Sequence, residues 1–83
     1  MIHIIGASGR SGAALCRALL REGLAFAPVV RDTAKWRATG LPGAPRLADL
    51  RDPDALRAAL SSADHVVNTA HARHAPAILA AAP

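Results

Sequence analysis

The stretch Met1-Ile-His-Ile-Ile-Gly-Ala-Ser-Gly-Arg-Ser-Gly12 decides the fold that we expect for this chain. It opens with an apolar run rich in β-branched residues, which predicts a buried strand over residues 1–5. Three glycines spaced three apart follow, Gly6, Gly9 and Gly12, and then a helical pattern begins. A strand that enters a helix through glycines at this spacing predicts a phosphate-binding turn.

Each glycine of this turn has its own physical task. Gly6 lets the chain turn sharply off the end of the strand, where a Cβ would clash. Gly9 lets the backbone approach a pyrophosphate, and Gly12 lets the helix pack closely against the sheet. The free N–H groups and the positive dipole end of that helix would then face the anion.

The rest of the chain alternates strands with helices. Leu15 and Leu19, one turn apart, predict a helix over residues 11–22 that stops at Gly23. The other expected elements are strands at 25–30, 46–48 and 65–69 and helices at 33–40, 53–62 and 76–82. Pro28 conflicts with the first half of the second strand, because proline removes a donor from the hydrogen-bond ladder.

This alternation indicates right-handed crossovers and a parallel sheet. We therefore expect one domain, residues 1–83, with an α/β fold: a Rossmann-like three-layer sandwich with strand order 3-2-1-4. The ligand of such a fold lies at the switch point between strands 1 and 4. The fourth strand would be left with an unpaired edge. We therefore expect the N-terminal half of a longer fold, truncated after strand 4. A missing C-terminal half or a second copy of the chain in a homo-oligomer would complete it.

Composition narrows the class of protein. The chain has 83 residues, 52% of them hydrophobic, and a formal net charge of +4, which suits an anionic ligand. There is no basic run and no aromatic platform, so we expect no nucleic-acid partner. No apolar run approaches the ~18 residues of a membrane span, and no signal peptide is visible, so we expect a cytoplasmic protein. Cys16 is the only cysteine and is expected to be buried in the first helix.

A second recognition signal follows the second expected strand. An acid here would hydrogen-bond the ribose of NAD, whereas an arginine accommodates the 2′-phosphate of NADP. The chain has Arg31 at this place and Lys35 four residues later. The planar guanidinium of Arg31 can hold a phosphate through two hydrogen bonds, and the Lys35 ammonium adds a positive charge. Asp32 is interpreted as a helix cap, with a ribose ligand as the alternative. The pattern favours NADP, with NAD possible.

Four segments resemble, in the right order, landmarks of the short-chain dehydrogenase/reductase superfamily. They are Gly-Ala-Ser-Gly-Arg-Ser-Gly (6–12), Val-Val-Arg-Asp-Thr-Ala-Lys (29–35), Ala-Asp-Leu-Arg-Asp (48–52) and Asp-His-Val-Val-Asn-Thr-Ala (64–70). The similarity is greatest to the atypical branch of NmrA-like and NAD(P)H-binding proteins, which includes flavin and biliverdin reductases. It covers nearly all 83 residues.

The resemblance implies which residues would bind the cofactor. Arg31 and Lys35 would hold the 2′-phosphate. Asp49 and Leu50 would flank the adenine, with the aspartate accepting from its amino group; the alternative for Asp49 is a loop carboxylate facing water. The pyrophosphate would be held by Gly6, Ser8, Gly9, Arg10, Ser11 and Gly12.

The segment after the fourth strand would line the nicotinamide side. The resemblance places Thr69 and Ala70 against the ribose there, while we prefer a structural role for Asn68 at the strand end. His71 and His74 are expected in a surface loop at the cofactor mouth, where His71 could touch cofactor or substrate. No third ligand is apparent for a metal site.

Catalytic residues are not assigned. Many members of the superfamily reduce carbonyls with a Tyr-x-x-x-Lys pair, and this chain contains no tyrosine. The resemblance implies the NADP-binding part of a reductase-like oxidoreductase acting on a small carbonyl, flavin or similar acceptor. The alternatives are a non-catalytic NAD(P)-sensing regulator of NmrA type and a fragment that binds nothing.

Overall fold

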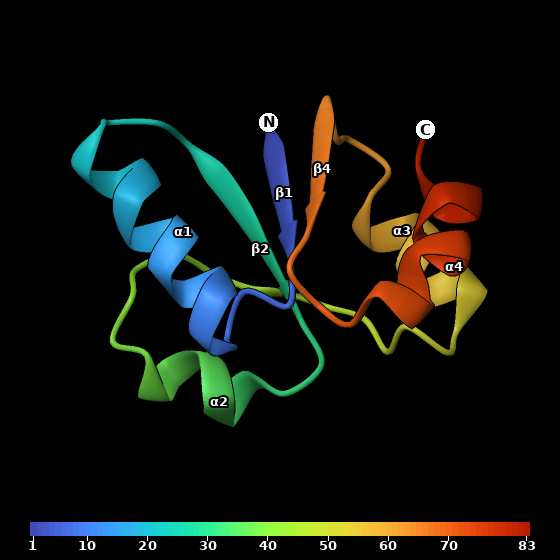
Figure 1. Cartoon of the computed structure of the whole chain (residues 1–83), viewed down its shortest axis with the longest axis horizontal. Coiled ribbons are helices and arrows are strands. Elements are labelled where there is room, and N and C mark those ends of the chain that lie inside the picture. Colours follow the sequence, from blue (N-terminus) through green and yellow to red (C-terminus); the bar gives the residue numbers. More distant parts are fainter.

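A computed structural model describes all 83 residues. Its elements are β1 (Ile2–Ile5), α1 (Arg10–Arg21), β2 (Phe26–Val30), α2 (Thr33–Ala38), β3 (Arg46–Leu47), α3 (Pro53–Ala59), β4 (His65–Asn68), the short 3-10 helix η1 (Ala72–His74) and α4 (Ala75–Ala81). All expected strands and helices are present, with ends shifted by up to about three residues. The helix η1 was not expected. In Figure 1 the sheet lies between α1 and α2 on one side and α3 and α4 on the other.

The four strands form one parallel sheet with the order β3-β2-β1-β4, which confirms the predicted topology. β1 is central, and its last residue Ile5 lies opposite Val29 of β2 and Asn68 of β4. The carboxyl ends of β1, β2 and β4 therefore reach the same edge of the sheet. β3 joins at that edge only, since it pairs with Val29 and Val30 alone.

This short pairing explains how β2 tolerates Pro28. The carbonyl of Val30 accepts from Ala48 N–H, so Val30 directs its backbone groups toward β3. Pro28 lies two residues earlier and therefore faces the same way. β3 begins opposite Val29, beyond the level of the proline. The missing N–H thus falls where β2 has no neighbouring strand, and the ladder with β1 is intact.

Successive residues of β1 point to opposite faces of the sheet and belong to two separate hydrophobic cores. Ile4 packs in one cluster with Cys16 of α1 and Trp36 of α2. Ile5 packs in the other with Leu56 of α3 and with Ile78, Ala81 and further apolar side chains. The sheet is thus covered on both faces, as the predicted three-layer sandwich requires. Cys16 is fully buried, as expected, and burial raises the pKa of its thiol.

Aspartates begin both short helices that follow β2 and β3. The Asp32 carboxylate accepts from Ala34 N–H at 2.9 Å and caps α2. Asp52 accepts from two N–H groups at the start of α3, where Pro53 occupies the first turn. These caps fix where the chain leaves the carboxyl edge of the sheet. None of the helices is long and apolar enough to cross a membrane.

Candidate functional site

The carboxyl ends of the strands open into one cleft of about 340 Å³. β1 contributes Ile5 and β2 contributes Val30, while Ala48 and Ala70 follow β3 and β4 directly. A crevice at this edge, where the strand order reverses, is where open parallel sheets bind ligands. Of the twelve residues proposed from sequence, seven line it: Gly6, Ser8, Arg31, Lys35, Asp49, Leu50 and Ala70.

The glycine turn contributes Gly6 and Ser8 to the cleft, and a side chain would not fit at Gly6 or Gly12. Gly6 has a φ of +78°, and a Cβ on it would lie 3.0 Å from both the Ala70 nitrogen and Thr69 Oγ1. A Cβ on Gly12 would overlap the carbonyl oxygen of Gly6 and lie 2.8 Å from Ala7 Cα. The tasks predicted for the first and third glycines therefore match their surroundings.

The start of α1 supplies backbone donors beside this wall. Gly9 is the N-cap without a side-chain cap, and no acid lies in the first helical turn. The N–H groups of Arg10, Ser11 and Gly12 have no acceptor within the helix, because they belong to its first turn. These four residues do not line the cleft itself, although Ser8 does. Free donors at a positive helix end suit an anion such as phosphate.

Two cations line the cleft where β2 ends. Arg31 and Lys35 are both exposed and both face it, one from the strand end and one from α2. Asp32 also lines the cleft, but its Oδ1 accepts from Ala34 N–H. The structure thus gives Asp32 the capping role favoured from the sequence.

Asp49 is tied to a residue that the sequence interpretation overlooked. Arg51 donates to it three times: from its backbone N at 2.9 Å and Nε at 3.1 Å, both to Oδ1, and from Nη2 at 2.8 Å to Oδ2. These hydrogen bonds, with the charge of Arg31 adding to them, hold the pKa of Asp49 far below its usual range. Leu50 lies between the pair, and all three residues line the cleft.

The end of β4 is held in place by side-chain hydrogen bonds. Thr69 donates from its hydroxyl to the Ile5 carbonyl at 2.6 Å and is not part of the cleft lining. Asn68 accepts from Ala70 N–H at 2.9 Å, in keeping with the structural role preferred for it. Ala70 does line the cleft. Both side chains therefore fix the backbone at the end of β4, and the ribose contact of Thr69 stays a prediction.

The helix η1 adds two residues to the cleft: His74, which was expected at the cofactor mouth, and Arg73, which the sequence interpretation overlooked. Arg73 and His74 line the cleft, whereas His71 caps η1 by accepting from Arg73 N–H at 3.0 Å and lies outside the lining. No spacing signal announces a 3-10 turn of three residues, so the orientation of these side chains could not be inferred. No group of three or more His, Cys, Asp or Glu side chains could hold a metal ion.

The cleft carries an excess of positive charge. Four cationic side chains line it, Arg31, Lys35, Arg51 and Arg73, against the two carboxylates of Asp32 and Asp49. One of these carboxylates is paired with Arg51, so the free charges are mainly positive. Together with the donors of α1, this arrangement favours a ligand with several negative charges.

Solved structures with this fold include longer proteins that hold a dinucleotide. The NADPH complex of NADPH-dependent quinone oxidoreductase from Escherichia coli is 29% identical, with a TM-score of 0.81 over 98% of this chain and 32% of that chain. The Thermus thermophilus UDP-glucose 4-epimerase complex with NAD is 26% identical, with a TM-score of 0.70 over 83% of this chain and 23% of that chain. This chain therefore spans about a third or less of their length.

A more distant structure shares the fold alone. It is a short-chain dehydrogenase/reductase superfamily protein from Agrobacterium tumefaciens with bound NAD, 22% identical at a TM-score of 0.69, matched over 98% of this chain and 25% of that chain. Comparison with curated proteins finds no match.

A family model described as NAD(P)H-binding matches residues 6–82, from the first glycine of the turn almost to the last residue. This match and the solved structures confirm the resemblance to NAD(P)-binding reductases of the short-chain superfamily, while the narrower NmrA-like relation stays a prediction. The chain belongs to the NAD(P)H-binding family.

Proposed function

We propose that this chain is the cofactor-binding part of an oxidoreductase and that it prefers NADP to NAD. One observation carries the preference: Arg31 and Lys35 both line the cleft at the end of β2, while the neighbouring Asp32 is engaged in capping α2. Two cations at this place suit a 2′-phosphate, and an acid bonded to its own helix competes less for ribose hydroxyls.

The residues present fit such a cofactor. Gly6 presents bare backbone to the cleft, and the first turn of α1 adds backbone donors with no acid in that turn. A volume of about 340 Å³ lies within the range of about 300–1,000 Å³ typical of ligand pockets, and suits the adenosine half of a dinucleotide. The bound cofactor would supply hydride transfer, while the chain binds and orients it.

The roles of individual residues follow from their places. Arg31 and Lys35 would bind the 2′-phosphate, and Asp49 and Leu50 would contact the adenine. Ala70, with Thr69 beneath it, would bound the site on the β4 side. The pyrophosphate would be held by Gly6, Ser8, Gly9, Arg10, Ser11 and Gly12.

The test is to titrate NADPH and NADH into the full chain and into variants. NADPH should bind more tightly than NADH. Arg31→Ala should weaken NADPH binding by about 10- to 100-fold and NADH binding by less than about threefold, because a hydrogen bond to a charged group contributes about 1.5–3 kcal/mol. Lys35→Ala should act in the same direction with a smaller effect.

Arg37→Ala is the matched control for these variants. Arg37 lies on α2 two residues from Lys35, is exposed and does not line the cleft. Its removal changes the net charge by the same amount and should leave the ratio of NADPH to NADH affinity unchanged. Equal binding of NADPH and NADH by the unaltered chain would contradict the NADP preference, and no binding of either would contradict the function.

An oxidoreductase role is supported by the Escherichia coli neighbour, which is an NADPH-dependent quinone oxidoreductase. This chain contains no tyrosine and so has no Tyr-x-x-x-Lys pair of its own. The proposal is tested by following NADPH oxidation in the presence of a small quinone. Consumption of NADPH matched by hydroquinone formation would support it. NADPH binding without turnover is expected equally of a cofactor-binding part and of a sensor, so it does not distinguish the two.

A further inference from the structure

We infer that Arg51 is a positioning residue that makes the site selective for adenine, by fixing the carboxylate of Asp49 as a hydrogen-bond acceptor in the wall of the cleft. The inference rests on the proposed function, since it takes the cleft as the place of the adenosine half of the cofactor. It assigns to Arg51 a role that the glycine turn and the cations after β2 do not provide.

Three hydrogen bonds from Arg51 hold the Asp49 side chain in one orientation. The Arg51 guanidinium donates from Nε to one carboxylate oxygen and from Nη2 to the other, a two-pronged contact that sets the carboxylate plane. The backbone N of Arg51 donates to Oδ1 as well, closing a local turn. The Asp49 carbonyl further accepts from Asp52 N–H at 2.9 Å, so the loop backbone is also fixed.

One acceptor position of the carboxylate is left for a ligand. An ionised carboxylate has about four lone-pair sites, and Arg51 occupies two on Oδ1 and one on Oδ2. The free site is on Oδ2. The Asp49 side chain is 37% exposed, and both it and Arg51 line the cleft. A ligand that covers this acceptor and displaces water from its open site should donate to it.

Apolar side chains next to this acceptor suit a flat base. Leu50 and Ala70 line the cleft from opposite sides of the β1 end and pack against the core beneath α3 and α4. Among the common purines, adenine presents an amino donor at position 6, while hypoxanthine and guanine present a carbonyl acceptor there. A bound base that displaces water from this acceptor without donating to it leaves the acceptor unpaired, which disfavours such analogues.

The same pairing makes an acid compatible with an anionic cofactor. Arg31, assigned above to the 2′-phosphate, is close enough to act electrostatically on Asp49. An unpaired carboxylate there would repel the phosphate, because like charges within a few ångströms disfavour each other. The Arg51 guanidinium offsets that charge while leaving the acceptor site in place.

The experiment compares NADPH with its analogue nicotinamide hypoxanthine dinucleotide phosphate, which has a carbonyl oxygen in place of the 6-amino group. The full chain should prefer NADPH by about tenfold or more, the discrimination expected of one hydrogen bond to a charged group. Arg51→Gln should reduce this preference to less than about threefold, since a neutral amide fixes the carboxylate more weakly. Arg51→Lys should retain an intermediate preference, because lysine restores the charge without the fork.

Two further variants sharpen the test. Asp49→Asn should abolish or reverse the preference, since a side-chain amide also offers a donor to the hypoxanthine carbonyl. Arg57→Gln is the matched control: Arg57 pairs with Asp54 on the exposed face of α3 and does not line the cleft. It should leave the preference unchanged. In the unaltered chain the preference should not change as the pH falls from 7 to about 4. In Arg51→Gln any remaining preference should decline near pH 4, because the pKa of the carboxyl is then no longer lowered by the guanidinium.

The outcomes separate this inference from the proposed function. An unchanged base preference in folded Arg51→Gln and Arg51→Lys overturns the role of Arg51 while leaving NADPH binding intact. A fall in the NADPH-to-NADH ratio with the base preference retained also overturns it, since Arg51 would then be a phosphate ligand. If the unaltered chain binds no dinucleotide, the proposed function fails first. Circular dichroism of each variant establishes that the comparison is made on folded protein.

Discussion

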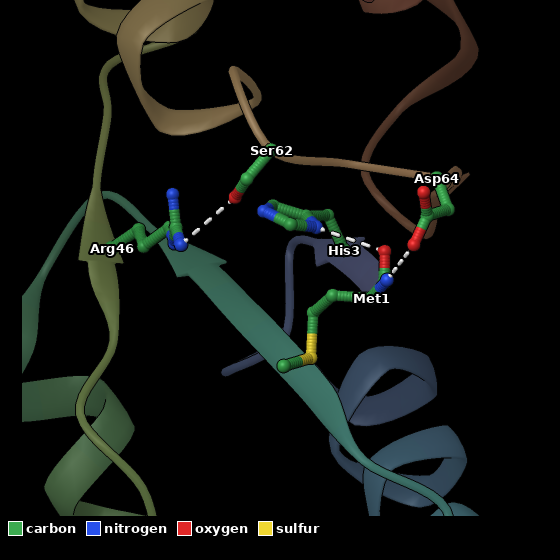
Figure 2. A network of polar contacts seen from close by, with 5 residues as sticks. All are labelled: Met1, His3, Arg46, Ser62 and Asp64. Carbon is green, nitrogen blue, oxygen red and sulfur yellow. Dashed lines mark hydrogen bonds and ion pairs between the residues drawn. The ribbon is translucent and has the colours of Figure 1, made fainter.

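The two edges of the parallel sheet use their polar groups in different ways. At the carboxyl edge, cations and backbone donors face an open cleft. At the amino edge, polar groups bond one another: the Met1 amine pairs with Asp64, and His3 Nδ1 donates to the Met1 carbonyl at 3.3 Å. Figure 2 also shows Arg46 at the start of β3, which donates to Ser62. Arg46 also donates to the carbonyl of residue 59, at the end of α3.

The difference shows that the charged groups of this fold that can bind a ligand lie at the carboxyl edge of the sheet. Arg31, Lys35 and Arg73 have no carboxylate partner in the cleft, so their charges are available to a ligand. Among the groups of the amino edge, only His3 Nε2 is buried without a hydrogen-bond partner. We therefore expect substitutions at the carboxyl edge to change binding, and those at the amino edge to change stability and its pH dependence.

The largest effect is expected for Gly12→Ala, at the carboxyl edge. Its Cβ would overlap the Gly6 carbonyl oxygen, and the backbone of the turn would have to move. We expect a loss of about 3 kcal/mol or more in the free energy of unfolding, the upper range for overpacking. Urea denaturation measures it.

Gly40→Ala is the control for this substitution. Gly40 also has a positive φ, +71°, but a Cβ there has nothing within 4 Å. The backbone strain alone should cost about 1 kcal/mol. Equal losses in Gly12→Ala and Gly40→Ala would contradict the close approach of α1 to the turn.

A smaller effect is expected at the amino edge, from the protonation of His3. Burial is the main cause that lowers the pKa of this fully buried side chain, with the charges of Arg46 and the Met1 amine adding to it; the Met1 hydrogen bond and Asp64 oppose the shift. The unfolded chain therefore takes up the proton first, at about pH 6.5. Stability should be fully present above that pH and should fall as the pH drops below it.

His3→Leu tests this dependence. It removes the unpartnered nitrogen and keeps an apolar side chain of similar size in the core. The variant should lose the decline between pH 6.5 and 5 and should exceed the unaltered chain at pH 5 by about 1–3 kcal/mol, the cost of an unsatisfied buried polar group. His65→Gln, on the exposed face of β4, should keep the decline. Unfolding curves that do not change from pH 7.5 to 5 in the unaltered chain would refute the assignment to His3.

The smallest effect is expected for Asp64→Asn. The pair between Asp64 and the Met1 amine is exposed on both sides, so screening by water and salt keeps its contribution to stability small. The amine lowers the pKa of Asp64, so this contribution is present at neutral pH and is lost as the pH falls below about 3.8. Denaturation in low and high salt measures it. A change in NADPH affinity in this variant would contradict the separation of the two edges.

Much of the fold followed from local patterns. The glycine spacing and the alternation of apolar segments set the strand order, and the parallel arrangement then brought Arg31 and Asp49 to one edge. Contacts that depend on loop conformation could not be predicted in this way. The pairing of Arg51 with Asp49 needs a tight turn after β3, and the hydroxyl of Thr69 meets a carbonyl 64 residues away in the chain. The inward placement of Arg73 depends on η1, whose three residues carry no periodic signal.

Pro28 has a consequence for how this protein behaves at high concentration. The first half of β2 has no neighbour on its β3 side, and unpaired strand backbone is a template for association between chains. A foreign strand laid against it would meet a proline where the ladder needs a donor. Pro28, which β2 tolerates because β3 begins beyond it, thus also protects the exposed part of β2 from intermolecular pairing.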